Sequence, residues 1–120
     1  MNVLSLFDGM SAGMIALERA GIKVKNYYAS EIDKHAIKVS KANYPNIVQL
    51  GDVTKVGVQE LPKIDLLIGG SPCQGFSIAG KQIAFDDPRS KLYFEYERIL
   101  NELKVINPNI KFLLENVKMK

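Results

Sequence analysis

The sequence has one cysteine, one histidine and no tryptophan among its 120 residues. A single cysteine excludes an internal disulfide, and Cys73 with His35 is too small a ligand set for a zinc site, so we expect no metal. The chain shows no charged leader followed by an apolar segment, and it has no long apolar run. We therefore expect neither secretion nor membrane insertion, and a reducing cytoplasm fits best.

The chain also has little excess charge of either sign. It contains 16 Lys and Arg residues and 13 Asp and Glu residues, which gives a formal net charge of +3. This weak excess is compatible with a nucleic-acid partner, but it is far from the clustered positive charge of a dedicated DNA-binding arm. Hydrophobic residues make up 47% of the chain, which is enough for one domain with a real core. We find no repeat, linker or low-complexity tract.

Apolar runs alternate with amphipathic stretches along the chain. We expect strands at residues 2–7, 24–30, 47–50, 64–68 and 110–114. Strands that alternate with helices are typical of parallel sheets joined by right-handed crossovers. The sequence therefore predicts an α/β fold with a mostly parallel sheet of about five strands.

Three helices are expected between these strands. The first follows Ser11, a plausible N-cap, and stops at Gly21. The second runs from Asp33 to Asn43 with Asp33 as its cap, and the third covers residues 92–106. Residues 53–62 show no clear preference. Residues 78–90 have no period and indicate a long surface loop, of a kind that often forms a lid.

The only cysteine lies in the stretch Gly69-Gly70-Ser71-Pro72-Cys73-Gln74-Gly75-Phe76-Ser77, directly after a buried strand. Sites in open parallel sheets lie beyond the carboxyl ends of strands, which is where Cys73 would be. Its thiolate could add to an electron-poor ring, and Glu115, after another strand, could stabilise the charge that develops. On identity and spacing alone, a buried structural cysteine and an exposed glutamate remain the more common interpretation.

A glycine-bearing turn, Gly9-Met10-Ser11-Ala12-Gly13, follows the first strand without matching the dinucleotide fingerprint. Glu31 comes 22 positions after Gly9, near the offset of about 20 residues at which an acid binds ribose hydroxyls. Asp52 stands after the third strand. Spacing alone explains Glu31 and Asp52 equally well as solvated carboxylates.

Six segments then occur in the order found in one enzyme family. They are Leu6-Phe7-Asp8-Gly9-Met10-Ser11-Ala12-Gly13, Ser30-Glu31-Ile32-Asp33, Gly51-Asp52-Val53, Gly70-Ser71-Pro72-Cys73-Gln74-Gly75-Phe76-Ser77, Asp87-Pro88-Arg89-Ser90-Lys91-Leu92-Tyr93-Phe94-Glu95 and Glu115-Asn116-Val117. Across essentially its whole length, the chain resembles the amino-terminal half of cytosine carbon-5 DNA methyltransferases of bacteria and phages. The Pro-Cys-Gln and Glu-Asn-Val elements are highly specific together. The resemblance implies a truncated Rossmann-like fold that uses S-adenosylmethionine.

The resemblance also implies roles for single residues. Cys73 would attack carbon 6 of a cytosine flipped out of DNA, and Glu115 would hold the base at ring nitrogen 3. Carbon 5 would then take the methyl group of S-adenosylmethionine. The residues implied in cofactor binding are Phe7 and Ile32 beside the adenine, Glu31 at the ribose, Asp52 at the adenine amino group, and Gly9, Gly13, Pro72 and Leu92. Those implied at DNA are Gln74, Ser77, Lys81 and Arg89.

Two positions depart from the family pattern, with Ser5 where Asp is frequent and Ser71 where proline is usual. Residues 1–120 would form a single partial catalytic domain, without the target-recognition domain and the carboxyl-terminal part. We expect such a fragment to be inactive or nearly so alone, and to need a complementary chain or self-association over its exposed sheet edge. The alternatives are a non-catalytic protein that binds S-adenosylmethionine, DNA or another protein, and a nicotinamide-dependent oxidoreductase, which the missing fingerprint disfavours.

Overall fold

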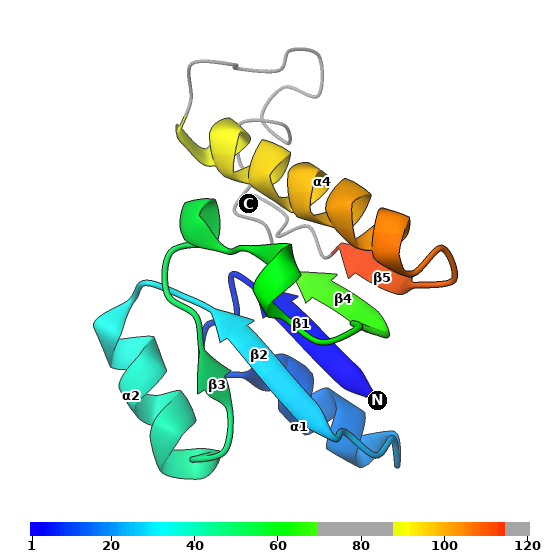
Figure 1. Cartoon of the computed structure of the whole chain (residues 1–120). Coiled ribbons are helices and arrows are strands. Elements are labelled where there is room, and N and C mark those ends of the chain that lie inside the picture. Colours follow the sequence, from blue (N-terminus) through cyan, green and yellow to red (C-terminus); the bar gives the residue numbers. More distant parts are fainter. Residues whose placement is uncertain (70–87, 115–120) are drawn as a thin grey trace, which may run out of the picture.

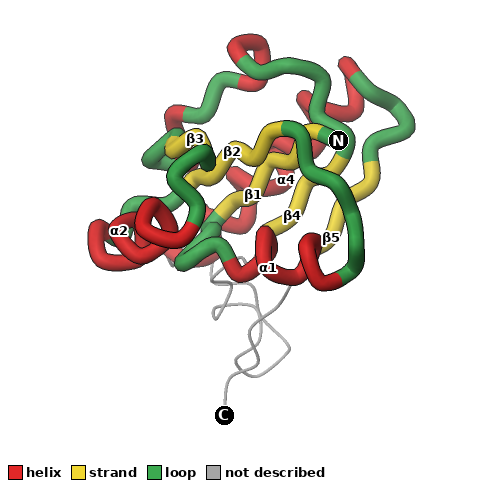
Figure 2. Tube along the Cα trace, turned by 90° about the horizontal axis from the view of Figure 1, so that it is seen from below, coloured by secondary structure: helices red, strands yellow, loops and turns green. Residues whose placement is uncertain are grey.

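The computed structural model describes residues 1–69 and 88–114, except the side chains of residues 88–93 and 114. The strands are β1 (Asn2–Leu6), β2 (Asn26–Ser30), β3 (Val48–Gln49), β4 (Leu66–Gly69) and β5 (Lys111–Leu114). They pair in parallel in the order β3-β2-β1-β4-β5, with β1 in the centre (Figures 1 and 2). The helices are α1 (Ala12–Arg19), α2 (Lys34–Asn43) and α4 (Pro88–Ile106), with short 3₁₀ turns η1 (Val53–Lys55) and η2 (Val58–Glu60). The predicted α/β, Rossmann-like fold with a five-stranded sheet is confirmed.

Strand β1 separates two apolar clusters. Val3 packs in a cluster with Leu17 of α1, whereas Leu4 and Leu6 pack in a cluster with Ile99 of α4. Leu17 and Ile99 come from helices that pack against opposite faces of β1, so this strand is buried on both sides. A strand covered on both faces needs a continuous apolar run rather than an alternating one, and this accounts for the first apolar segment of the sequence.

The ends of α1 and α2 can be compared with the stop and cap residues expected from the sequence. Gly21 has φ 74°, and its N–H donates to the Glu18 carbonyl while the Ile22 N–H donates to Leu17, which is a Schellman end. Asp33 caps α2 by accepting hydrogen bonds from the backbone N–H groups of the second and third residues after it. Ser11 occupies the N-cap position of α1 as expected, but its side chain makes no cap hydrogen bond.

Several boundaries differ from the expected ones, including those of β3, β4 and β5, which begin or end one or two residues from the expected positions. Helix α4 begins at Pro88 instead of Leu92, inside a segment expected to be loop. Proline suits the first turn of a helix because its missing N–H has no partner there, so the proline marks the start. Strand β2 begins at Asn26, two residues late, and residues 53–62 contain the two 3₁₀ turns. The rest of the expected loop, residues 78–87, lies outside the described residues.

Strand β5 is the last strand of the described sheet on its side. Its side chains Phe112 and Leu113 are 51% and 61% exposed, and Val105 and Ile106 at the end of α4 are exposed nearby in sequence. A parallel strand is normally covered on both faces. The expected uncovered apolar edge is therefore present in the described part of the chain.

Candidate functional site

A small hollow of about 50 Å³ lies at the carboxyl ends of the first three strands. It is lined by Phe7 after β1, Ser30 to Ile32 after β2, and Gly51 to Val53 after β3. Parallel strands bring their carboxyl ends to one edge, so segments far apart in sequence meet there. The structure thus brings together four residues that the sequence singled out for cofactor binding: Phe7, Glu31, Ile32 and Asp52.

Glu31 is the most heavily engaged side chain of the hollow. Its Oε1 accepts a hydrogen bond from the Gly9 N–H at 2.7 Å, and its Oε2 accepts from the N–H groups of Ile32 at 3.0 Å and Asp33 at 2.9 Å. An ionised carboxylate has about four acceptor positions, so one remains for a hydroxyl donor. Glu31 therefore ties the turn after β1 to the start of α2 and still has an acceptor to offer.

Asp52 presents one engaged and one open oxygen. Its Oδ1 accepts from the Thr54 N–H at 2.9 Å and from the Thr54 hydroxyl at 2.8 Å. The backbone hydrogen bond from Thr54, followed by its hydroxyl, lowers the pKa of the Asp52 carboxyl. Its Oδ2 makes no hydrogen bond with any described residue. An ionised acceptor is thus held at the rim of the hollow, near Ile32, whose side chain is 71% exposed.

The turn after β1 has an unusual backbone. Phe7, Gly9 and Ser11 have φ angles of 54°, 62° and 68°, so three of five consecutive residues are left-handed. Two of them carry side chains, which makes the conformation costly and dependent on its surroundings. Gly9 has no Cβ, so it adopts the left-handed conformation without steric strain.

Gly13 lies one residue beyond the start of α1, and its surroundings show a packing role. A Cβ built there would come within 2.5 Å of Ile68 Cδ1 and 2.9 Å of Tyr27 Oη. Glycine therefore lets α1 approach the sheet closely. Its predicted part in cofactor binding stays a prediction.

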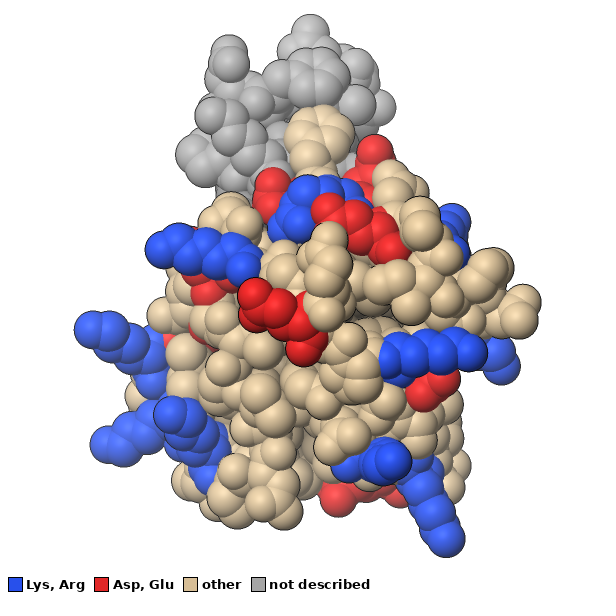
Figure 3. Space-filling view, viewed as in Figure 1, with Lys and Arg blue, Asp and Glu red and all other residues tan. Residues whose placement is uncertain are grey.

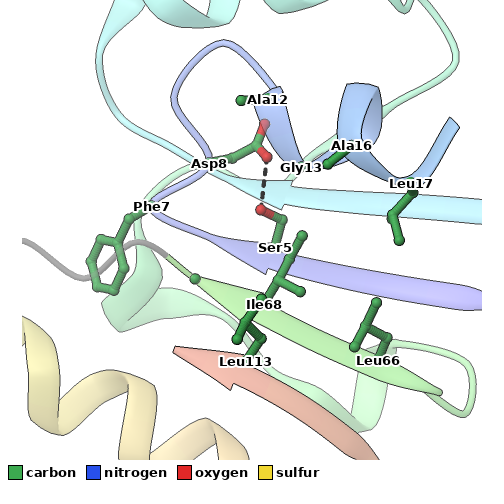
Figure 4. Close-up of a pocket in the computed structure, with 11 residues that line it drawn as sticks. Ser5, Phe7, Asp8, Ala12, Gly13, Ala16, Leu17, Leu66, Ile68 and Leu113 are labelled. Carbon is green, nitrogen blue, oxygen red and sulfur yellow. Dashed lines mark hydrogen bonds between the residues drawn. The ribbon is translucent and has the colours of Figure 1, made fainter. Parts of the chain in front are cut away.

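A larger apolar groove of about 420 Å³ lies beside α1 over β1, β4 and β5 (Figure 4). Leu66 and Ile68 of β4 and Leu113 of β5 line it together with the small residues Ala12 and Gly13. Phe7 belongs to both the groove and the smaller hollow. The turn that carries Phe7 therefore separates the two spaces.

Sequence reasoning missed one constellation, which is centred on Asp8. Its Oδ1 accepts hydrogen bonds from Ser5 Oγ and Tyr27 Oη, both at 2.7 Å, and its Oδ2 accepts from Ser11 Oγ. Burial, followed by the Asp8 charge, raises the pKa of the Tyr27 hydroxyl well above its usual range. A signal was available, because hydroxyl residues stand three positions before and three positions after Asp8.

The remaining predicted residues are not described. Pro72, Cys73, Gln74, Ser77 and Lys81 fall within residues 70–87, and Glu115 falls within residues 115–120. Arg89 and Leu92 belong to α4, but their side chains lie outside the described ones. The roles of all eight stay predictions.

The described strands do show where the segments with Cys73 and Glu115 begin. Gly69 ends β4 and Leu114 ends β5, and these two residues are register partners in the parallel ladder. The two segments thus start from neighbouring strand ends, at the same edge of the sheet as the hollow. Glu115 follows Leu114 directly, and Cys73 comes four residues after Gly69.

The strand order and the hollow at the carboxyl edge of the sheet are those of a Rossmann-like α/β domain. The chain belongs to the C-5 cytosine-specific DNA methylase family, whose model matches residues 1–119. It is 45% identical over 117 residues to the type II methyltransferase M1.ScrFI of Lactococcus lactis subsp. cremoris, covering 98% of this chain and 28% of that protein. It is 43% identical over 120 residues to the orphan methyltransferase M.Rho11sI of Bacillus phage rho11s, covering 98% and 23%. The chain therefore spans about a quarter of the length of these relatives.

Solved structures show the same fold. A mutant of DNMT2 from Spodoptera frugiperda matches with a TM-score of 0.66 and 27% identity, covering 98% of this chain and 35% of that one. The Dnmt2 methyltransferase of S. pombe matches with a TM-score of 0.71 and 22% identity, covering 98% and 36%. Within residues 1–69 and 88–114, no helix has the length and apolar character to cross a membrane, and no group of His, Cys, Asp and Glu side chains is arranged to hold a metal ion.

Proposed function

We propose that this chain is the part of a DNA (cytosine-5-)-methyltransferase that binds S-adenosylmethionine and supplies the nucleophile. The observation that carries the proposal is the hollow in which Glu31 and Asp52 lie beside Phe7 and Ile32. Family membership over residues 1–119 supports the same reaction. As one domain, residues 1–120 would be a partial catalytic domain.

The hollow offers the adenosine part of S-adenosylmethionine three kinds of contact. Phe7 and the exposed Ile32 provide apolar surface for the two faces of the adenine ring. The remaining acceptor position of Glu31 suits a ribose hydroxyl. The open Oδ2 of Asp52 suits the adenine amino group, because a carboxylate oxygen is a strong hydrogen-bond acceptor.

The chemistry is proposed for residues beyond the described ones. The Cys73 thiolate forms a bond to carbon 6 of the flipped cytosine, and Glu115 holds ring nitrogen 3 while charge builds on the ring. When bound, S-adenosylmethionine supplies the methyl group for carbon 5. Loss of the proton from carbon 5 and of the Cys73 sulfur from carbon 6 then restores the aromatic ring. A cytoplasmic location would keep this thiol reduced.

DNA is the proposed substrate, in a modification system like those of the type II relatives. On the face seen in Figure 3, Lys and Arg side chains are spread around the margin and interspersed with acidic ones, without a single basic patch. We therefore assign DNA contact to the segment with Gln74, Ser77, Lys81 and Arg89.

We further propose that methyl transfer requires a complementary chain or a self-associated copy. The chain spans about a quarter of the length of these relatives, and within the described residues Phe112 and Leu113 of β5 are 51% and 61% exposed. An uncovered apolar edge of a parallel sheet favours association. A complementary chain would supply the parts of the relatives that residues 1–120 do not span.

Calorimetry with S-adenosylmethionine and with NAD tests the cofactor site. We expect heat of binding for S-adenosylmethionine only, and its loss in Asp52→Ala. Thr54→Ala is the matched control, because it removes one hydrogen bond to Asp52 and leaves the Oδ2 acceptor. Binding of NAD instead, or equal S-adenosylmethionine binding by Asp52→Ala, would contradict the assignment.

A further inference from the structure

Asp8 is the only carboxylate that is buried among the described residues, with 8% of its surface exposed. Within that part of the chain no Lys or Arg forms an ion pair with it. Its negative charge is instead met by three hydroxyl donors: Ser5, Ser11 and Tyr27. A buried carboxylate is tolerated only when it is well hydrogen-bonded, so these donors are a structural requirement of the site.

The donors come from separate elements. Ser5 belongs to β1, Ser11 closes the turn after β1, and Tyr27 belongs to β2. Ser11 Oγ also contacts Ser40 Oγ of α2, completing a buried network whose hydroxyls are fully or almost fully enclosed. One carboxylate thus fixes the turn relative to the central strands and to α2.

The network explains the N-cap position of α1. Ser11 is left-handed, and its hydroxyl donates to Asp8 instead of accepting from the first turn of the helix. The same turn aims the Gly9 N–H at Glu31 Oε1 and places Phe7 at the hollow. Two non-glycine residues in left-handed conformations need such external fixing.

We propose that Asp8 is a positioning residue of the cofactor site. Its carboxylate holds the left-handed turn over residues 7–11, so that Gly9 reaches Glu31 and Phe7 forms the wall of the hollow. Asp8 is buried, and in this proposal it acts through the turn and not by contact with the cofactor. The consequence for S-adenosylmethionine affinity rests on the proposed function, whereas the consequence for the turn does not.

Asp8→Asn tests the proposal because the amide keeps the shape but offers one oxygen acceptor in place of two. Asp65→Asn is the matched control. Asp65 Oδ2 also ties two segments of the sheet, by accepting from the Asn2 N–H at 2.8 Å, but it does so at the amino ends of the strands. Stability is measured for both variants by urea unfolding, and comparisons are made where both are folded.

Two readouts separate positioning from general stability. The first is hydrogen exchange of the Gly9 amide by NMR, relative to amides of β1 and β2. We expect Asp8→Asn to speed Gly9 exchange about tenfold more than that of the strand amides, and Asp65→Asn not to. The second is S-adenosylmethionine affinity, which we expect to fall about tenfold in Asp8→Asn only. Tyr27→Phe removes one of the three donors and should move both readouts less, so it serves if Asp8→Asn does not fold.

Each outcome of the exchange and affinity measurements supports or overturns a part of the proposal. Wild-type Gly9 exchange in Asp8→Asn would overturn the proposal, whether or not S-adenosylmethionine binds. Faster Gly9 exchange with unchanged affinity would overturn the link from the turn to the cofactor site. Faster Gly9 exchange in a chain whose wild type binds no S-adenosylmethionine would support the positioning of the turn and count against the proposed function.

Discussion

The Gly9 N–H donates to Glu31 Oε1 across 2.7 Å, joining the turn after the central strand to the end of its neighbour. The two residues lie 22 positions apart, at the spacing that the sequence singled out. Their contact gives that spacing a physical meaning, because the acid stabilises the turn as well as facing the hollow. A ligand that binds Glu31 therefore binds a carboxylate whose position is already fixed.

Glu31→Gln tests this double role. The amide keeps one acceptor oxygen and introduces a donor that faces backbone N–H groups, so we expect about 1–2 kcal/mol less unfolding free energy. S-adenosylmethionine affinity should fall about tenfold, because a neutral amide oxygen accepts a hydrogen bond from the ribose hydroxyl more weakly than an ionised carboxylate does. Urea unfolding and calorimetry measure the two effects. Asp33→Asn is the control: it keeps a good N-cap on α2 and should change neither quantity much. An unchanged affinity in Glu31→Gln would remove Glu31 from the site.

The pKa of Asp52 provides a second test. Because Thr54 lowers this pKa in the folded chain, Asp52 favours folding above the ordinary pKa of Asp, about 3.9, and this contribution is lost as pH falls through the lowered value. Thr54→Ala removes the hydroxyl donor and keeps the backbone donor, which is the larger cause. We expect NMR titration to show the pKa of Asp52 moving partway back toward its ordinary value. A full return, or no movement, would contradict the two-donor geometry.

Tyr27 should make stability fall at high pH. Its pKa is raised in the folded chain by burial and by Asp8, so the folded state is favoured below the unfolded value of about 10 and loses this advantage as pH rises further. We expect the unfolding free energy to drop between about pH 9 and about pH 11 more in the wild type than in Tyr27→Phe. Urea unfolding of both proteins at the two pH values measures the difference. Equal drops would show that another group is responsible.

Gly13→Ala tests the close approach of α1 to the sheet. The added methyl group would meet Ile68 and Tyr27, and we expect a loss of about 1–3 kcal/mol of unfolding free energy. Gly57→Ala is the control, because its Cβ would meet only Glu60 at 3.7 Å. Combining Gly13→Ala with Ile68→Val removes the Cδ1 atom in the clash and should recover part of the loss. No recovery would locate the strain at Tyr27 instead.

The sequence was informative where a local pattern has one structural solution. Apolar runs gave the five strands, and Gly21 and Asp33 mark helix ends through conformations that their side chains favour. Phe7, Glu31, Ile32 and Asp52 could be placed at one edge because parallel strands share their carboxyl ends. The placement of these residues at one edge needs only periodicity and topology, whereas the roles of Phe7 and Ile32 are implied by the family resemblance.

Other features depend on tertiary contacts that no local pattern encodes. Ser11 looked like an ordinary N-cap, but a buried carboxylate competes for its hydroxyl. The need for glycine at position 13 of α1 comes from Ile68 of β4 and Tyr27 of β2. The departure at Ser5 also acquires an explanation, because its hydroxyl donates to Asp8 three residues later. At this strand end the carboxylate is thus at position 8 instead of position 5.

Methyl transfer to DNA tests the central claim most directly. The chain is mixed with a polypeptide that corresponds to the remaining, carboxyl-terminal part of a relative such as M1.ScrFI, and transfer of labelled methyl groups from S-adenosylmethionine to cytosine is measured. We expect labelled 5-methylcytosine with the mixture, little or none with either chain alone, and none when Cys73→Ser replaces the wild-type chain. Undiminished methylation by the Cys73→Ser mixture would contradict the assignment of the nucleophile and, with it, the account of this chain as the part of a cytosine methyltransferase that carries the nucleophile.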